Sequence, residues 1–491
     1  MRRALPRAAL CLVLVFAVAC SGAAGSDLPT PADPPAPTSA PPTTAAPAPS
    51  VPRPKNIVVI LTDDQRWDTL WAMPRVQQDL IEPGVVFENA YVVNPVCCPS
   101  RASILTGLYS KHTGVYTNGR PDGGVWAFDP RRTIATSLQH AGYRTALVGK
   151  YLNGYEGTAV PPGWDRWFAF AGGDFGANYV DYVVNDDGRL RNFGSAKPEY
   201  SLDVLTGQAV RLIRQTRKPL FLYLAVSAPH SPAIPAPRYA SGFVSGLEPN
   251  RPPSFNEADV SDKPRWLRRL DPLHELPDGS VPRSDDRQAQ HMATLLSVDE
   301  MVGTVIDTLA EQGELEETMI VFASDNGLQS GEHRLTSKYV PYEESIRIPL
   351  VVRFDPAMQA GVRNRDLALN IDIAPTIAAA AGVRRTDHDG RSLLPLLRNK
   401  DVAWRDDFLV EHAREGTGPP VPSYCAIHGE RWVYVRYATE EEELYDLQTD
   451  PYQLANLSES KGVRGRLEDM RRQLRGACRP TPPGFPASAL P

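Results

Sequence analysis

Cysteine, excess positive charge and long hydrophobic runs are all scarce in this chain of 491 residues. Only 6 residues are cysteine, which is too few for a small domain held together by disulfide bonds. Lys and Arg number 52 against 58 Asp and Glu, so the formal net charge is −6. This balance argues against nucleic acid as the main partner, because phosphate binding needs a clustered excess of Lys and Arg. The 42% share of hydrophobic residues instead indicates a globular protein.

The apolar run over residues 8–19 is too short for a comfortable membrane span, which needs about 20 residues. It follows three arginines and ends at Cys20, a pattern that predicts an export signal over residues 1–20. The residues around Cys20 resemble a bacterial lipoprotein cleavage site, so we expect a lipid on Cys20 and membrane anchoring through that lipid alone. The alternative is an ordinary cleaved signal, an incidental cysteine and a secreted protein. No other segment is typical of a membrane-spanning helix.

Proline is abundant instead, with 47 residues in the chain. Between Pro29 and Pro54, 11 of 26 residues are proline, and the rest of residues 21–54 is rich in Ala, Thr and Ser. Such a composition cannot bury a core and predicts an extended spacer. We expect this linker to hold a catalytic domain away from the membrane.

Four apolar runs predict strands that are buried on both faces of a sheet. Helical patterns lie between them, and the clearest begins after Ser284 as its N-cap and ends at Gly313. Strands alternating with helices predict an α/β fold with a largely parallel sheet, here over residues 55–397. The four runs cover residues 56–61, 145–148, 220–226 and 319–323.

The pattern changes toward the C-terminus, where we expect a smaller α+β subdomain over residues 398–491. Cys425 and Cys478 both lie there, and a disulfide bond between them suits an exported protein. The predicted elements are strands over residues 431–437 and 443–447 and a helix with a polar face over residues 461–475.

Each of the four predicted strands of the larger domain is followed by polar residues. Because ligands bind outside the carboxyl ends of parallel strands, we expect these residues to converge on one crevice. They are Asp63 and Asp64 after the first run, Lys150 and Asn153 after the second, His230 after the third, and Asp325 and Asn326 after the fourth.

Asp63, Asp64, Asp325 and Asn326 all offer hard oxygen ligands. Such a set suits Ca²⁺ or Mg²⁺ better than zinc, which prefers His and Cys. The alternative interpretation is that each Asp caps a helix or forms a turn at its strand end. Pairs of oxygen ligands at two different strand ends favour the metal site.

A fifth group is the run Cys97-Cys98-Pro99-Ser100-Arg101. Pro99 suits the first position of a helix and Gly107 suits its end, which places Cys97 at the helix N-terminus. Free backbone N–H groups and the helix dipole favour an anion there. The spacing of the two cysteines alone favours a structural pair.

Together these motifs resemble the type I, formylglycine-dependent sulfatase family, over roughly residues 55–460. The resemblance implies an alkaline-phosphatase-like sandwich with a large mixed, mostly parallel sheet flanked by helices, followed by the smaller subdomain. Several ordered motifs are far more specific than a lone C-x-P-x-R. They are Asp63-Asp64, the run from Cys97 to Gly107, Asp325-Asn326-Gly327, Gly331-Glu332-His333, Lys338, residues 341–350, and the segments 443–447, 450–451 and 456–457.

The resemblance also implies a mechanism. Cys97 would be oxidised to formylglycine by a formylglycine-generating enzyme, and a hydroxyl of its hydrate would attack the sulfate sulfur. The resemblance implies that Ca²⁺, with Mg²⁺ as an alternative, is held by the modified Cys97 and the four oxygen ligands. It implies further that Lys150 and Lys338 hold sulfate oxygens, that Arg101 supports the hydrate and that His230 is a general acid.

The residues after the second predicted strand narrow the range of expected substrates. Gly149-Lys150-Tyr151-Leu152-Asn153 is similar to the N-acetylglucosamine-6-sulfatase branch, and Asn153 would bind substrate there without transferring protons. Gly331-Glu332-His333 is more typical of broad arylsulfatases, and His333 has two interpretations, sulfate contact or packing beside Glu332. We therefore expect hydrolysis of the 6-O-sulfate of N-acetylglucosamine or related glycans. The alternatives are a broad arylsulfatase, a phosphonate monoester hydrolase and, in another class, an inactive glycan-binding lipoprotein.

Overall fold

The computed structural model of the protein describes residues 52–172, 178–240, 248–416 and 418–491. The predicted signal peptide with Cys20, and the predicted linker as far as residue 51, lie outside these residues. Within the described ranges, no helix combines the length and the apolar character that a membrane span requires.

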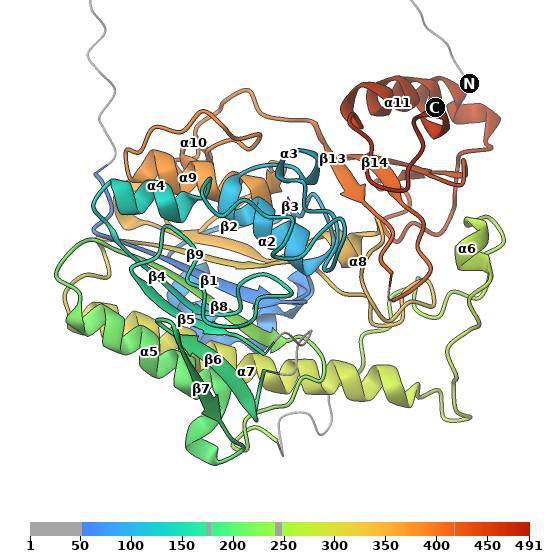
Figure 1. Cartoon of the computed structure of the whole chain (residues 1–491). Helices are drawn as coiled ribbons and strands as arrows, with labels where there is room; N and C mark the ends of the chain where they lie inside the picture. The colour runs from blue at the N-terminus through green and yellow to red at the C-terminus, as the bar shows by residue number, and fades with distance from the viewer. Residues whose placement is uncertain (1–51, 173–177, 241–247, 417) are drawn as a thin grey trace, which may run out of the picture. The chain divides into compact units, whose positions relative to one another are not determined.

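A ten-stranded sheet runs through the centre of the described chain (Figure 1). Its five central strands are parallel to one another, and antiparallel strands flank them on both sides. This is the mixed, mostly parallel sheet that the sequence predicts. From one edge to the other, the strands are β11 (Val362–Asn364), β2 (Val85–Phe87), β10 (Leu350–Arg353), β9 (Thr318–Ser324), β1 (Asn56–Asp63), β8 (Leu220–Pro229), β4 (Arg144–Gly149), β5 (Arg166–Phe170), β6 (Tyr182–Asp186) and β7 (Arg189–Phe193).

The four predicted strands lie side by side in the middle of this sheet, as β9, β1, β8 and β4. Every residue of β1 and β8 is buried, as a continuous apolar, β-branched run predicts for a strand covered on both faces. The register places Leu61 beside both Ala225 and Ala323. The polar residues that follow the strands therefore emerge together at one edge of the sheet.

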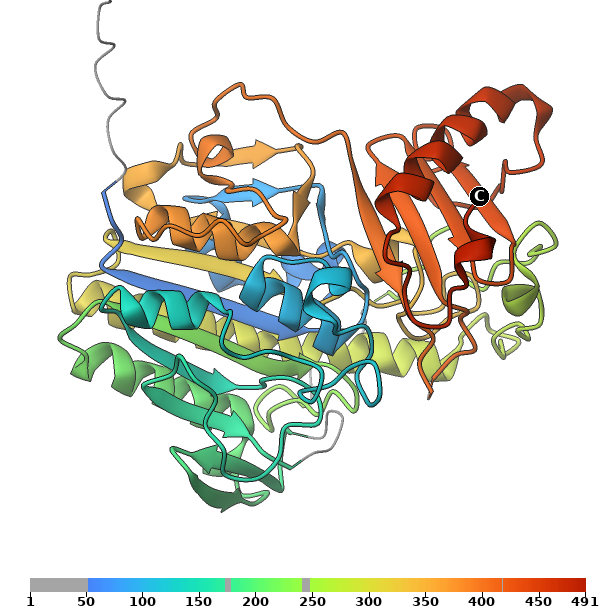
Figure 2. The same cartoon turned by 45° about the horizontal axis from the view of Figure 1, so that its top comes forward.

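Helices cover both faces of the sheet (Figures 1 and 2). One face packs against α5 (Ser201–Gln215) and α7 (Pro282–Glu311). The other packs against α2 (Cys97–Thr106), α4 (Ile134–His140) and α9 (Ile373–Ala380). Alternate residues of each strand supply the two apolar cores, because successive side chains of a strand point to opposite faces. Shorter helices are α1 (Pro74–Val76), α3 (Ser110–Thr113), α6 (Arg265–Arg268), α8 (Glu343–Ile346) and α10 (Leu394–Leu397).

Two helices begin earlier than the sequence predicts. Helix α7 begins at Pro282, and Ser284 donates its hydroxyl hydrogen bond to the carbonyl of Ser330 instead of capping the helix. Helix α2 begins at Cys97, so that Pro99 lies inside its first turn. Proline suits the first turn because its ring fixes φ and its missing N–H has no partner there.

A smaller antiparallel sheet forms the C-terminal part of the chain. Helix α11 (Arg464–Ala477) packs on one face of it, and the other face joins the core of the large sheet. A disulfide bond links Cys425 in this sheet to Cys478, which follows α11, with the Cα atoms 6.2 Å apart. The strands in sheet order are β13 (Asp407–His412), β14 (Tyr424–Gly429), β15 (Trp432–Tyr437) and β16 (Glu442–Asp446), while β3 (Ala90–Tyr91) and β12 (Ala368–Leu369) pair separately.

The hairpin of β6 and β7 at the edge of the large sheet is not among the predicted strands. Strand β7 is mostly exposed, so it lacks the apolar run that marks the central strands. A turn signal is present, because Asp187-Gly188 joins the two strands with φ angles of 49° and 89°. An Asp-Gly pair with both φ angles positive is a strong hairpin signal.

Candidate active site

The polar ends of the central strands meet at the carboxyl edge of the sheet. Asp63 ends β1, Asp64 follows it, and Asp325 and Asn326 follow β9; all four are buried. The backbone N–H of Asp64 donates to Oδ1 of Asp325 over 3.2 Å, and Asn326 Nδ2 donates to Asp64 Oδ1 over 2.6 Å. The two pairs that the sequence singles out therefore form one cluster.

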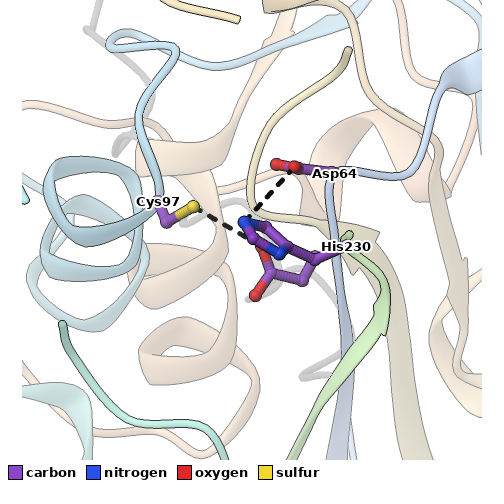
Figure 3. Close-up of side chains that lie close together, drawn as sticks. Asp64, Cys97 and His230 are labelled. Carbon is purple, nitrogen blue, oxygen red and sulfur yellow. Dashed lines mark hydrogen bonds and ion pairs between the residues drawn. The ribbon is translucent and has the colours of Figure 1, made fainter. Parts of the chain in front are cut away.

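Cys97 is the first residue of α2, and its thiol points toward Asp64 and His230 (Figure 3). The Nζ of Lys338 donates to Sγ over 2.7 Å, and Oδ1 of Asp63 lies 3.5 Å from Sγ. Every residue of α2 is buried. Burial and the charge of Asp63 raise the pKa of the Cys97 thiol well above its usual range, so the unmodified thiol stays neutral.

Arg101, one turn further along α2, is fully buried beneath the cluster. Its Nε donates to Asp325 Oδ2 over 2.7 Å, and its Nη2 lies 3.3 Å from Asp63 Oδ2. Its Nη1 donates to the carbonyl of Lys150 over 3.2 Å. One guanidinium thus fixes the ends of three strands relative to the helix that carries Cys97.

Two lysines complete the charge balance of the cluster. Lys150 pairs with Asp63, and Lys338 pairs with Asp64. Burial raises the pKa of Asp63, but the positive groups around it, led by Lys150, outweigh burial and hold that pKa well below its usual range. Burial lowers the pKa of Lys338, yet Asp64 and Cys97 raise it to a net value well above normal. Both members of each pair therefore stay charged in the interior.

The cluster fits a divalent cation. One potential ligand atom from each of Asp63, Asp64, Cys97 and His230 lies within 4.8 Å of the other three. Asn326 adds a buried side-chain oxygen that has no hydrogen-bond partner among the described residues. An unpaired buried acceptor costs about 1–3 kcal/mol, and coordination to a cation removes that penalty. Carboxylate and amide oxygens are ligands that suit Ca²⁺ or Mg²⁺.

His230 lies just beyond the end of β8, with its side chain 18% exposed. Its Nδ1 lies 2.6 Å from the carbonyl of Ser231, so Nδ1 carries a proton that this carbonyl accepts. Its Nε2 faces the cluster, 3.7 Å from Asp64 Oδ2 (Figure 3). The geometry leaves Nε2 as the atom of this ring that can exchange a proton at the site.

The structure places the two proposed substrate residues differently. Asn153 is buried and lines a small cavity together with Lys150, and its Oδ1 has no partner within the described part of the chain. His333 is fully buried, with Nδ1 2.6 Å from Glu257 Oε2 and its ring centroid 4.2 Å from that of Tyr342. His333 thus packs among core side chains rather than in the group of potential metal ligands.

Helix α7 contributes residues that no sequence motif indicates. His291 is buried and lines a cavity that also contains Asp64. Burial lowers the pKa of His291 to about 3, so its ring is neutral at ordinary pH. Arg287, one turn earlier, donates to the carbonyl of Thr336 in the loop that carries Lys338. The spacing of four residues between Arg287 and His291 marks one helix face, but it is a pattern common to most surface helices.

The chain belongs to the sulfatase family. The family model described as Sulfatase matches residues 55–383, and a model described as N-sulphoglucosamine sulphohydrolase, C-terminal, matches residues 331–479. These matches confirm the resemblance that the motifs around Cys97 and Asp325 carry.

Named relatives agree with this family. An extracellular sulfatase SULF-1 homolog of Drosophila melanogaster is 37% identical over 380 residues, which cover 73% of this chain. This chain spans only 33% of that protein and 52% of a related Caenorhabditis elegans protein. The N-acetylglucosamine-6-sulfatase of Homo sapiens is 35% identical over 395 residues, covering 76% of this chain and 70% of that protein.

A solved structure supports the fold. It is described as a complex with its substrate, D-glucosamine-2-N,6-O-disulfate, and superposes with a TM-score of 0.77 at 25% sequence identity. The match covers 87% of this chain and 98% of that chain. The superposition therefore spans most of both chains.

Proposed function

We propose that this protein hydrolyses sulfate esters, with Cys97 in its formylglycine form and a divalent cation held by the surrounding carboxylates. The position of Cys97 carries the proposal. Its Sγ lies 2.7 Å from Lys338 Nζ and 3.5 Å from Asp63, at the start of a buried helix and inside a cluster of potential metal ligands. In a chain of the sulfatase family, this is the place for the nucleophile. A formylglycine-generating enzyme is the partner that would convert it.

The formylglycine hydrate supplies two hydroxyl groups on one carbon, one to attack sulfur and one to open the route by which sulfate leaves. The cation, Ca²⁺ or Mg²⁺, supplies positive charge that reduces repulsion between the nucleophile and the anionic ester. Asp63, Asp64, Asp325 and Asn326 are its proposed protein ligands, together with the oxygen borne by modified residue 97.

The remaining residues have roles that follow from their contacts. Lys150 and Lys338 exchange part of their interaction with Asp63 and Asp64 for sulfate oxygens, and so stabilise charge that develops in the transition state. Arg101 holds the carboxylates in place from below. His230 presents Nε2 toward the cluster and is suited to give a proton to the departing alcohol.

We propose the 6-O-sulfate of N-acetylglucosamine in glycans as the substrate. The human relative is named for that activity, and the solved neighbour is described as bound to a 6-O-sulfated glucosamine. Asn153, beside Lys150, would hydrogen-bond this sugar but not transfer protons. His333, fixed between Glu257 and Tyr342, is suited to holding its loop rather than to contacting sulfate.

We propose that the enzyme acts outside the cytoplasm. The name of the Drosophila relative, an extracellular sulfatase, supports export. The predicted signal and Cys20 would give a lipid anchor, and cleavage without lipidation would give a secreted enzyme.

The test combines mass spectrometry with an assay. Trypsin releases residues 76–101 as one peptide, because Arg75 and Arg101 are its flanking cleavage sites. We expect this peptide from active protein to have lost the sulfur of Cys97 and gained an aldehyde oxygen. Finding only the thiol in active protein would overturn the mechanism.

The assay compares N-acetylglucosamine-6-sulfate, an aryl sulfate and a phosphonate monoester. We expect the sugar sulfate to have the highest kcat/KM. The highest rate on the aryl sulfate or on the phosphonate would favour the arylsulfatase or the phosphonate hydrolase alternative. Glycan binding without turnover, with an unmodified thiol at Cys97, would favour an inactive glycan-binding lipoprotein.

A further inference from the structure

Two cavities lie beside the proposed active site and adjoin at Arg251. The first, of about 450 Å³, is bounded by Asp64 of the cluster and by His291 of α7. The second, of about 600 Å³, extends from the first toward Arg347 and Tyr452. Four residues line both cavities: Arg66, Asp68, Asn250 and Arg251.

We propose that the two cavities form one groove for a glycan chain. The sulfated sugar occupies the cavity beside Asp64, and the next sugar along the chain lies across Arg251 in the second cavity. This inference rests on the proposed sulfatase function and specifies its substrate as a chain rather than a single sugar.

Arg251 is a fixed hydrogen-bond donor at the junction. Its Nη2 donates to Asp285 Oδ1 over 2.5 Å, and its guanidinium lies 3.9 Å from the ring centroid of Phe255. Its Nη1 is buried and has no partner among the residues that the structure describes. Because the side chain is already held on two sides, a further hydrogen bond to a sugar oxygen loses little conformational entropy.

The first cavity has the mixed lining that a sugar ring needs. Met292 of α7 contributes apolar surface, and Trp71 stands at the rim with 57% of its surface exposed. An exposed aromatic ring can pack against the C–H face of a pyranose. His291 is neutral, and its Nε2 has no partner in the described chain, so it is available to a sugar hydroxyl.

The second cavity has a binding role only, because none of the residues assigned to sulfate chemistry lines it. Tyr452 stands in its wall with 39% of its surface exposed. The volume is within the range of ligand sites, about 300–1,000 Å³. A monosaccharide sulfate in the first cavity would leave this second, directly adjoining space unused.

The experiment compares kcat/KM for three probes in the enzyme with converted residue 97. They are N-acetylglucosamine-6-sulfate, a chito-trisaccharide with 6-O-sulfate on each sugar, and an aryl sulfate. We expect the trisaccharide to exceed the monosaccharide at least about tenfold in the wild type, mainly through KM. Arg251→Ala should remove most of this preference, as loss of one hydrogen bond from a charged donor predicts, while the aryl sulfate rate stays within about twofold.

Arg191→Ala is the matched control. Arg191 also pairs with one aspartate, Asp186 at 2.7 Å, and also lies over one phenylalanine, Phe193 at 5.4 Å, but it lines neither cavity. We expect this variant to retain the full preference for the trisaccharide.

Tyr452→Ala guards against a folding effect, because loss of Arg251 leaves Asp285 without its cation. Tyr452 is exposed and lines only the second cavity, so its removal should lower the trisaccharide preference about threefold and leave the aryl sulfate rate unchanged. Equal kcat/KM for trisaccharide and monosaccharide in the wild type would overturn the groove. So would an equal loss on all three probes in both variants.

Binding to the Cys97→Ala protein separates this inference from the proposed function. Calorimetric titration with the trisaccharide and the monosaccharide needs no turnover. Tighter binding of the trisaccharide, weakened by Arg251→Ala, supports the groove even if the wild type hydrolyses none of the probes. Equal affinity for both sugars rejects it even if sulfate esters are hydrolysed.

Discussion

The ammonium group of Lys338 donates a hydrogen bond to the thiol of Cys97 over 2.7 Å, although 241 residues separate the two in the sequence. The same ammonium pairs with Asp64. One lysine therefore connects the start of α2, the end of β1 and the loop after β9. Changes at these residues should therefore alter activity.

Replacing Cys97 by serine should abolish turnover and leave the fold intact. Serine is only slightly smaller than cysteine and can occupy the same buried position. It offers a single hydroxyl, however, and is not converted to the aldehyde. We expect kcat to fall by at least about 10³-fold, with a melting temperature within a few degrees of the wild type. Sulfate release and a thermal melt measure both. Retained activity in Cys97→Ser would contradict the assignment of the nucleophile.

Removing the ammonium of Lys338 should weaken catalysis more than it weakens substrate binding. Lys338→Ala takes away a charge that we assign to sulfate oxygens in the transition state, so kcat and kcat/KM should both fall about 10²–10³-fold, with little change in KM. Steady-state kinetics measure the effect. Lys55→Ala is the control, because Lys55 is a half-exposed lysine paired with Glu314. A loss of less than about threefold in Lys338→Ala would argue against a role in catalysis.

Chelation should inactivate and destabilise the protein. A cation that binds only the folded state adds about 2.7 kcal/mol to the free energy of unfolding at 100 times its Kd. We expect a chelator to lower the melting temperature, and Ca²⁺ or Mg²⁺ to restore both stability and activity. Asp64→Ala is the matched variant, and its melting temperature should respond to neither. A wild-type melting temperature that is indifferent to chelator and cation would speak against the metal site.

The disulfide between Cys425 and Cys478 should stabilise the C-terminal subdomain. It closes a loop with a sequence separation of 53 residues, for which the chain-entropy model predicts about 4 kcal/mol, with measured values commonly 2–4 kcal/mol. The double variant Cys425→Ser/Cys478→Ser should lose about that much in a urea titration. Reducing agent should lower the wild-type midpoint and leave the variant unchanged; an equal response in both would show that the bond does not form in solution.

Glu411 should make the protein less stable as the pH rises. Burial raises its pKa to about 8, although the backbone N–H of Lys111 donates to one of its oxygens over 3.3 Å. The folded state therefore holds a proton that the unfolded state releases near pH 4.5, the ordinary value for Glu. Between these values the free energy of unfolding falls by up to about 1.4 kcal/mol per pH unit on account of this group.

The variant Glu411→Gln tests this dependence, because it keeps the shape and removes the titration. Urea midpoints at pH 5 and pH 8 should differ more in the wild type than in the variant. Glu311→Gln, at an exposed glutamate on α7, is the control and should follow the wild type. Parallel pH profiles for the wild type and Glu411→Gln would contradict the prediction.

The sequence predicts the centre of the fold well, because strands buried on both faces need continuous apolar runs. β1, β4, β8 and β9 are such strands, and each is followed by polar residues at the same edge of the sheet. The proximity of Asp63, Asp325 and His230 therefore follows from the sequence pattern alone. The edge strands are not predicted in this way, because one or both of their faces are polar or exposed.

The residues that line the two adjoining cavities could not be predicted from the sequence, for a different reason. Arg251 lies in a loop and His291 in the middle of a long helix, and neither belongs to a motif with fixed spacing. Their significance arises from long-range packing, such as the stacking of Arg251 on Phe255 and the approach of α7 to Asp64. Contacts of this kind have no local signature.

Burial of α2 has a consequence for the order in which the chain folds and is modified. Cys97 is 1% exposed, and the four residues that follow it are buried as well. A second enzyme cannot seat this segment in its own active site once the core has closed around it. The conversion of Cys97 that we propose would therefore have to precede the completion of folding, while the run from Cys97 to Arg101 is still an extended peptide. On this proposal, a chain that folds before it meets the modifying enzyme would keep the fold and lack the proposed nucleophile.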